Sequence, residues 1–119
     1  MKKLLLLAAV GINTSVFAMC DGDLTQTELN ICSFKEYQAA DKTLNKTYNQ
    51  YLTTLNTTQK KQFKTVQLNW IKYKESDCKY QSSAYQGGSI QPLVENSCLT
   101  EKTKQRTQEL KAYLEEANM

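Results

Sequence analysis

Four cysteines are the residues of this chain whose type and spacing point most directly to chemistry. Cys20, Cys32, Cys78 and Cys98 all follow an N-terminal segment with the features of an export signal. In an oxidising compartment, an even number of cysteines in a small secreted chain indicates disulfide bonds. The sequence therefore predicts a small extracytoplasmic domain that is held together by two disulfides.

Four cysteines allow three pairings. Cys20–Cys32 with Cys78–Cys98 is favoured because each bridge closes a local loop, and Cys32–Cys78 with Cys20–Cys98 is the nearest alternative. A zinc site is disfavoured because the chain has no C-x-x-C pair and no histidine. We expect all four sulfurs at one end of the fold, and neither a metal nor another cofactor.

The export signal comprises residues 1–18. A basic start is followed by the apolar run Leu4–Val10, which is too short to remain in a bilayer as an anchor, and small or medium residues precede a cleavage position after Ala18. Met19, rather than a small residue, precedes Cys20 and argues against a lipoprotein. We expect a cleaved secretory signal at 1–18 and a single domain at 19–119, periplasmic or secreted, with no stable membrane insertion.

Composition narrows the function classes. The formal charge is +3, and Lys2 and Lys3 lie in the signal, so the remainder is close to neutral and gives no electrostatic case for nucleic-acid binding. The absence of histidine removes the commonest general base, so the serines have no histidine to activate them. We do not expect an enzyme.

Helical spacing dominates residues 25–114, and a single proline and four glycines leave few helix breakers. Thr25 and Glu28 form a capping box that predicts the first helix start, and a cap for the second helix is expected within Asn56-Thr57-Thr58. The apolar positions recur in steps of mostly three or four: Leu29, Cys32, Tyr37, Ala40, Leu44, Tyr48, Leu52 and Leu55; then Phe63, Val66, Trp70, Tyr73 and Cys78; then Leu93, Val94, Cys98, Leu99, Thr103, Leu110, Tyr113 and Leu114. The fold class is all-α, an antiparallel three-helix bundle stapled by two disulfides.

The main irregular stretch separates the second and third helices. Gly87 and Gly88 permit backbone angles that stop a helix, Ser89 is placed to cap the next helix, and Pro92 is tolerated in its first turn. The segment Ser83–Ser89 lies between Cys78 and Cys98. It is either a simple connector or a polar loop that a bridge would pre-order for binding.

Charged and aromatic residues of the helices have structural interpretations. Gln67, Trp70 and Tyr73 share helical spacing, and we expect Trp70 in the core rather than as a platform for a sugar ring. Asp41 and Asp77 are expected to pair with Lys74 or Arg106 across helices. The lysines at 60, 61, 64, 72 and 74 are expected to form a solvated face.

Several of these motifs together resemble the LprI-type lysozyme inhibitor family. The resemblance is carried by Cys20, Thr25-x-x-Glu28-Leu29-x-x-Cys32, Ala40-Asp41-x-x-Leu44-Asn45-x-x-Tyr48, Gln67-x-x-Trp70-x-x-Tyr73-Lys74-x-x-Asp77-Cys78, Gly87-Gly88-Ser89 and Cys98-Leu99. It covers Cys20 to about Tyr113, and the block around Trp70 is its most specific part. The family is small, helical, cysteine-bridged and either secreted or lipid-anchored.

The resemblance implies binding to a lysozyme or a related glycoside hydrolase. Such an inhibitor must occlude a cleft that holds two carboxylates. We expect the irregular stretch to do so, with Ser83, Tyr85, Gln86, Gly87, Gly88 and Ser89 as the lysozyme-binding loop. The alternative is a non-inhibitory envelope protein-binding module of the same fold. A thiol-based redox protein would need reactive cysteines at a spacing that this chain lacks.

Overall fold

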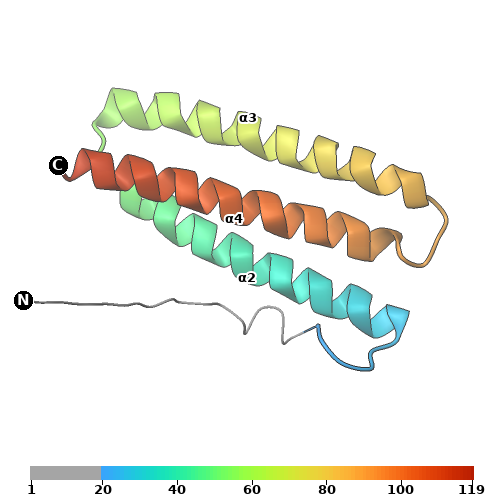
Figure 1. The fold of residues 1–119 in the computed structure, drawn as a ribbon. Helices are drawn as coiled ribbons and strands as arrows, with labels where there is room; N and C mark the ends of the chain where they lie inside the picture. Colours follow the sequence, from blue (N-terminus) through green and yellow to red (C-terminus); the bar gives the residue numbers. More distant parts are fainter. Residues whose placement is uncertain (1–19) are drawn as a thin grey trace, which may run out of the picture.

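The computed structural model describes residues 20–119, so the secretory signal expected at 1–18 lies outside the described residues. Within them the chain forms the long helices α2 (Gln26–Leu52), α3 (Thr57–Ser82) and α4 (Gln91–Ala117), and a short 3₁₀ turn, η1 (Ser83–Tyr85), follows α3 (Figure 1). No strand occurs between residues 20 and 119. The predicted all-α, three-helix fold is confirmed.

The first two helices begin at the capping residues that the sequence indicates. Thr25 and Glu28 bond reciprocally through side chain and backbone at the start of α2, and Asn56 and Gln59 do the same at the start of α3. The predicted cap at Ser89 is wrong. Helix α4 begins after Ile90, which offers no side-chain cap, because a backbone turn leads into the helix and Pro92 in the first turn lacks an N–H.

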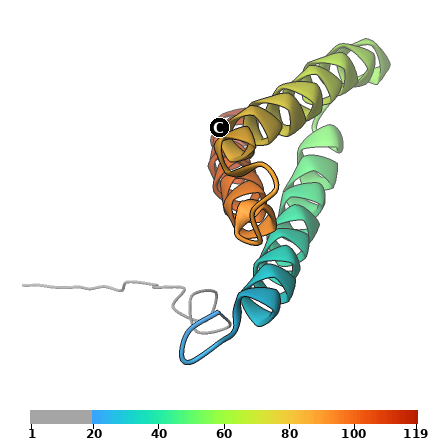
Figure 2. The ribbon, with the colours of Figure 1, turned by 90° about the vertical axis from the view of Figure 1, so that its right-hand side faces the viewer.

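Helix α4 packs against both α2 and α3 and so forms the middle of the fold (Figure 1). Figure 2 shows α2 and α3 closest at the turn that joins them and wider apart toward the other end. Helices α2 and α4 approach closely because small residues are buried between them, namely Ala40 on α2 and Thr103 and Thr107 on α4. Helices α2 and α3 contact one another through long side chains, such as Tyr48 and Tyr51 against Phe63.

The interior contains few large apolar side chains. Leu44 and Leu110 are buried, and polar residues fill much of the remaining core: Ser33, Thr47, Gln67, Lys74, Ser82, Thr100, Thr103, Arg106 and Thr107. A core with so little apolar volume gains less from the hydrophobic effect than a typical domain core does. The disulfides and the polar contacts between helices must therefore supply a large share of the stability.

The predicted stripes differ from the observed core mainly on the second helix, and Tyr113 of the third stripe is also exposed. Val66 and Tyr73 were expected inside the second helix, but they are 47% and 56% exposed. Gln67 and Lys74, each one position further along, take the inward places. Lys74, which was expected on a solvated face, is only 3% exposed. This shift is possible because both polar heads find partners within the bundle.

Among residues 20–119, no helix combines the length and hydropathy that crossing a bilayer requires.

Candidate functional site

The disulfides pair as Cys20–Cys32 and Cys78–Cys98, with Cα atoms 5.5 Å apart in each, which confirms the favoured connectivity. Both bridges lie at the end of the fold where α2 begins, α3 ends and α4 begins; this end is called the disulfide end below (Figure 1). Within the described chain every cysteine is bonded, and no cluster of metal-ligating residues occurs.

Residues 83–89 connect α3 to α4 at the disulfide end and are called the apical loop below. Every residue of the loop is exposed. Consecutive backbone turns shape it: the Gln86 N–H donates to the Ser83 carbonyl at 3.1 Å, and the Gly88 N–H donates to the Tyr85 carbonyl at 2.9 Å. Gly87 has a φ of +83°, a left-handed conformation that residues with a Cβ rarely adopt.

The apical loop is fixed at both ends. The Cys78–Cys98 disulfide closes the segment that contains it. The Asn30 side-chain amide on α2 donates to the Ser89 carbonyl at 2.9 Å. Asn96 in turn donates to the Asn30 carbonyl at 3.3 Å and to the buried Ser33 hydroxyl at 3.0 Å. The loop is therefore tied to all three helices while its surface remains open.

The side chains of the loop differ in their availability. The Ser83 hydroxyl donates to the Tyr80 carbonyl, so it serves to close the end of α3. Tyr85 is 47% exposed, and neither its side chain nor that of Gln86 has a hydrogen-bond partner among the described residues. The exposed Ser89 hydroxyl likewise has no hydrogen-bond partner among residues 20–119, so Tyr85, Gln86 and Ser89 are the loop residues whose side-chain polar atoms are available to another molecule.

Exposed apolar residues of the disulfide end were missed by sequence reasoning. Ile31 and Phe34 near the start of α2 are 54% and 48% exposed, and Ile90 directly after the loop is 38% exposed. Ile31 and Phe34 are apolar residues that lie outside the predicted apolar stripe of the first helix. Their positions in the sequence therefore indicated that apolar side chains would be exposed on that helix. Apolar side chains beside a fixed polar loop are typical of a protein-binding surface.

The block around Trp70 contributes several of the contacts between α3 and the other helices. The Gln67 side-chain oxygen accepts from Arg106 Nε at 3.0 Å, and Lys74 Nζ donates to the Tyr37 hydroxyl at 2.7 Å. Lys74 Nζ and Arg106 Cζ lie 5.0 and 5.9 Å from the centre of the half-buried Trp70 ring. Trp70 therefore serves to hold two buried cations by cation–π contact.

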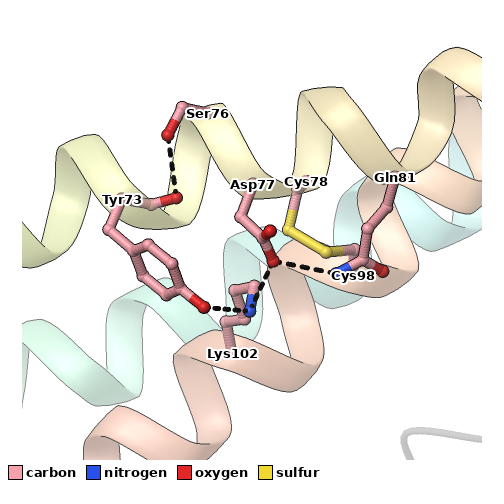
Figure 3. A network of polar contacts seen from close by, with 7 residues as sticks. All are labelled: Tyr73, Ser76, Asp77, Cys78, Gln81, Cys98 and Lys102. Carbon is pink, nitrogen blue, oxygen red and sulfur yellow. Dashed lines mark hydrogen bonds and ion pairs between the residues drawn. A yellow bond between two sulfur atoms is a disulfide. The ribbon is translucent and has the colours of Figure 1, made fainter.

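The prediction that Asp41 and Asp77 pair with Lys74 or Arg106 is wrong, because both aspartates have other partners. Asp77 pairs with Lys102 at 2.8 Å, and Lys102 also donates to the Tyr73 hydroxyl at 3.3 Å (Figure 3). Hydrogen bonds from Lys102, and then from Gln81, hold the pKa of Asp77 below its usual value, and the bond to Asp77 raises the pKa of Lys102.

The remaining members of the expected pairs have other partners. Arg106 bonds to Glu109 at 2.9 Å, and Asp41 accepts from Asn45 on its own helix. Neither aspartate reaches Lys74 or Arg106.

A shallow groove of about 500 Å³ runs between α2 and α4. Small residues such as Ala39 and Thr43 line one side, and Gln105 and Gln108 line the other. Glu36 borders the groove, and partial burial raises the pKa of its carboxyl group while the charge of Lys104 acts against this rise. The groove contains no nucleophile with an adjacent base, so its residues offer no arrangement for covalent catalysis.

Comparison with known proteins places these features in a family. No solved structure matches the chain. A curated relative, an uncharacterized protein of Rhizobium meliloti (strain 1021) called R02472, is 34% identical over 111 residues, which cover 82% of this chain and 80% of the relative. The family model described as lysozyme inhibitor LprI matches residues 20–110, a range that includes all four cysteines, the block around Trp70 and the apical loop. The chain therefore belongs to the LprI lysozyme inhibitor family.

Proposed function

We propose that this protein inhibits a lysozyme or a related peptidoglycan hydrolase by inserting the apical loop into the active-site cleft. Family membership supports lysozyme as the class of partner. The observation that carries the mechanism is that the loop is exposed along its whole length while both of its ends are bound to the helices.

The chemistry of the loop suits a cleft that contains carboxylates. Glycoside hydrolases use a pair of acidic side chains on either side of the bond they cleave. Residues 83–94 contain no Asp or Glu, so the loop and the first turn of α4 bring no negative charge toward that pair. Tyr85 and Gln86 provide hydroxyl and amide donors that can bond to carboxylate oxygens.

Rigidity of the loop favours tight binding. A mobile loop loses conformational entropy when it binds, whereas a loop already held in shape avoids most of that loss. The Cys78–Cys98 bridge, the Asn30 bond to the Ser89 carbonyl and the left-handed turn at Gly87 restrain the loop before any partner is present. Tyr85, an amphipathic residue of the type found in interface hot spots, then forms the central contact.

The proposed site of action is the periplasm or the extracellular space. Two disulfides require an oxidising compartment, and the expected cleavable signal at residues 1–18 would deliver the chain there. Peptidoglycan and the hydrolases that attack it are accessible in that compartment.

Titration of the purified, disulfide-bonded protein into lysozymes of several types, with the turbidity of a cell-wall suspension as the readout, tests the proposal. We expect slower lysis with at least one type. Tyr85→Ala should weaken inhibition about 30-fold, the effect of losing a hot-spot side chain. Gly88→Pro should weaken it as well, because proline removes the N–H that donates to the Tyr85 carbonyl.

Tyr80→Ala is the matched control, since Tyr80 is 76% exposed on the last turns of α3 and lies outside the loop. Circular dichroism should show the same helix content in all variants. Full inhibition by both loop variants would refute the assignment of the loop. No inhibition of any lysozyme at a large molar excess would leave the non-inhibitory binding module as the function.

A further inference from the structure

Helix α3 lies at the edge of the fold and has an uncovered side. Its inward side is defined by Gln67, Lys74 and Cys78, which are all buried. In Figures 1 and 2 no other helix of residues 20–119 lies beyond α3 on its outward side. This outward side is not part of the apical loop, and the proposed inhibition does not use it.

Two rows of exposed side chains follow the outward side of α3, and together they are called the outer face below. At 3.6 residues per turn, spacings of three, four and seven keep side chains in one row. The first row is Lys61, Lys64, Leu68, Lys72, Glu75 and Lys79, and the second is Val66, Tyr73 and Tyr80. Lys64 and Glu75 offset one another, which leaves Lys61, Lys72 and Lys79 as the net positive charge of the first row. Leu68 is 49% exposed and Tyr80 is 76% exposed, although both would gain by leaving water.

Positive charge is concentrated on this helix. Helix α3 carries Lys60, Lys61, Lys64, Lys72, Lys74 and Lys79, against Glu75 and Asp77. The ion pair with Lys102 compensates the charge of Asp77 (Figure 3). The same lysine bonds to the Tyr73 hydroxyl and fixes the ring at the edge of the outer face. Between the two rows lie the uncharged residues Thr65, Asn69 and Ser76.

We propose that the outer face of α3 binds the surface of a membrane that contains anionic lipids, with the helix axis parallel to that surface. Charge complementarity selects an anionic partner, and the exposed apolar row selects one with an apolar layer beneath its charges. Tyrosines favour the headgroup region, where the ring is buried and the hydroxyl stays hydrated. Lysine stems can extend along the same boundary with their ammonium groups at the lipid phosphates.

Other occupants fit the outer face less well. A second copy of the chain would bring two identical rows of lysines together, and like charges in contact repel. A soluble polyanion would use the lysines but would leave Leu68, Val66 and Tyr80 in water. Because the apical loop directly follows α3, a membrane-bound α3 would hold the loop beside the membrane surface with its exposed side still accessible.

Sedimentation of the purified, disulfide-bonded protein with lipid vesicles tests this proposal. Vesicles of phosphatidylcholine alone are compared with vesicles that also contain phosphatidylglycerol. Each lysine close to an anionic surface contributes about five-fold to the affinity, so Lys61, Lys72 and Lys79 together predict a preference of roughly 100-fold for the anionic vesicles. Molar salt should abolish most of that preference because it screens the charges.

Two sets of variants separate the contributions of charge and apolar area. The triple change Lys61→Gln, Lys72→Gln and Lys79→Gln should remove most of the preference for anionic vesicles. The matched control Lys42→Gln, Lys46→Gln and Lys111→Gln alters the net charge equally at exposed positions of α2 and α4 and should retain most of it. Leu68→Ser with Tyr80→Ser should weaken binding several-fold at every salt concentration.

Equal binding to neutral and anionic vesicles would overturn the proposal, and so would an equal effect of the two lysine triples. Unchanged binding of the Leu68→Ser and Tyr80→Ser variant would indicate a soluble polyanion as the partner and would also overturn it. Inhibition of a lysozyme in solution should be unchanged in the outer-face variants. A failure of the membrane test is therefore distinct from a failure of the proposed inhibition.

Discussion

Removal of the Cys78–Cys98 disulfide is the most informative perturbation, because this bridge connects the stability of the bundle to the order of the apical loop. Alanine is the suitable replacement at both positions, since Cys78 is fully buried and serine would place an unpaired hydroxyl in the core. The double variant Cys78→Ala and Cys98→Ala leaves the Cys20–Cys32 bridge in place at the same end of the fold.

The size of the effect follows from the length of the closed loop. The bridge spans a sequence separation of 20, for which chain entropy predicts about 3 kcal/mol of stabilisation. For a domain of this size, each kcal/mol corresponds to roughly 4–8 °C in melting temperature. We therefore expect the variant to melt about 12–24 °C below the parent protein, and somewhat lower still because each replacement removes a sulfur atom from the packed end.

Thermal unfolding followed by circular dichroism measures this difference, and Cys20→Ala with Cys32→Ala serves as the matched control. The Cys20–Cys32 separation of 12 predicts a similar entropic loss of about 3 kcal/mol, but that bridge does not enclose the apical loop. At a temperature where both variants are folded, only the Cys78 and Cys98 variant should lose inhibition. Melting within about 5 °C of the parent, or equal inhibition by both variants, would refute the reasoning.

Three further predictions concern polar contacts that hold the helices and the apical loop. Tyr37→Phe leaves the buried Lys74 ammonium without its hydrogen bond and should lower the free energy of unfolding in urea by about 1.5–3 kcal/mol. Lys74→Met should lower it less, because that change also removes the buried charge. A larger loss for Lys74→Met than for Tyr37→Phe would contradict this account. The lowered pKa of Asp77 means that its pair with Lys102 stabilises the fold above the ordinary aspartate pKa, and that this contribution is lost as the pH falls through the folded pKa. The raised pKa of Lys102 means that the ion pair stabilises the fold until the pH rises through the folded pKa of Lys102. The melting temperature of Asp77→Asn should therefore vary less with pH than that of the parent protein, in both the acidic and the alkaline range. Asn30→Ala should accelerate amide hydrogen exchange in the apical loop with little change in global melting, and unchanged exchange would show that the bond to the loop carbonyl does not order it.

Most features determined within a few residues of sequence were predictable, although the local cap expected at Ser89 is not formed. The capping box at Thr25 and Glu28 and the cap at Asn56 involve contacts over three residues, so their geometry is encoded locally. The disulfide pairing was also accessible, because each bridge joins cysteines that are close in sequence. The position of the loop followed from Gly87 and Gly88 in the same way.

The interior was harder to predict because its contacts join different helices. Arg106 and Lys102 lie one helical turn apart on α4, and the axial position of α3 beside α4 decides which of them meets Asp77. Lys74 was expected in water because a lysine is rarely buried without a partner. Its partners are the Trp70 ring, four residues earlier on the same helix, and the Tyr37 hydroxyl on α2, and nothing in the sequence marks the contact with Tyr37.

The block around Trp70 contributes to the site by holding α3 in place. Gln67 bonds to Arg106, Trp70 contacts two cations, Asp77 pairs with Lys102, and Cys78 is bonded to Cys98. The contacts with Arg106, Lys102 and Cys98 fix α3 against α4, and the apical loop begins five residues after Cys78. The block around Trp70 therefore helps to hold the loop in place, and under the proposed function the exposed side chains of the loop would select the partner. Exchange of residues 83–89 between family members should accordingly transfer partner preference without altering helix packing.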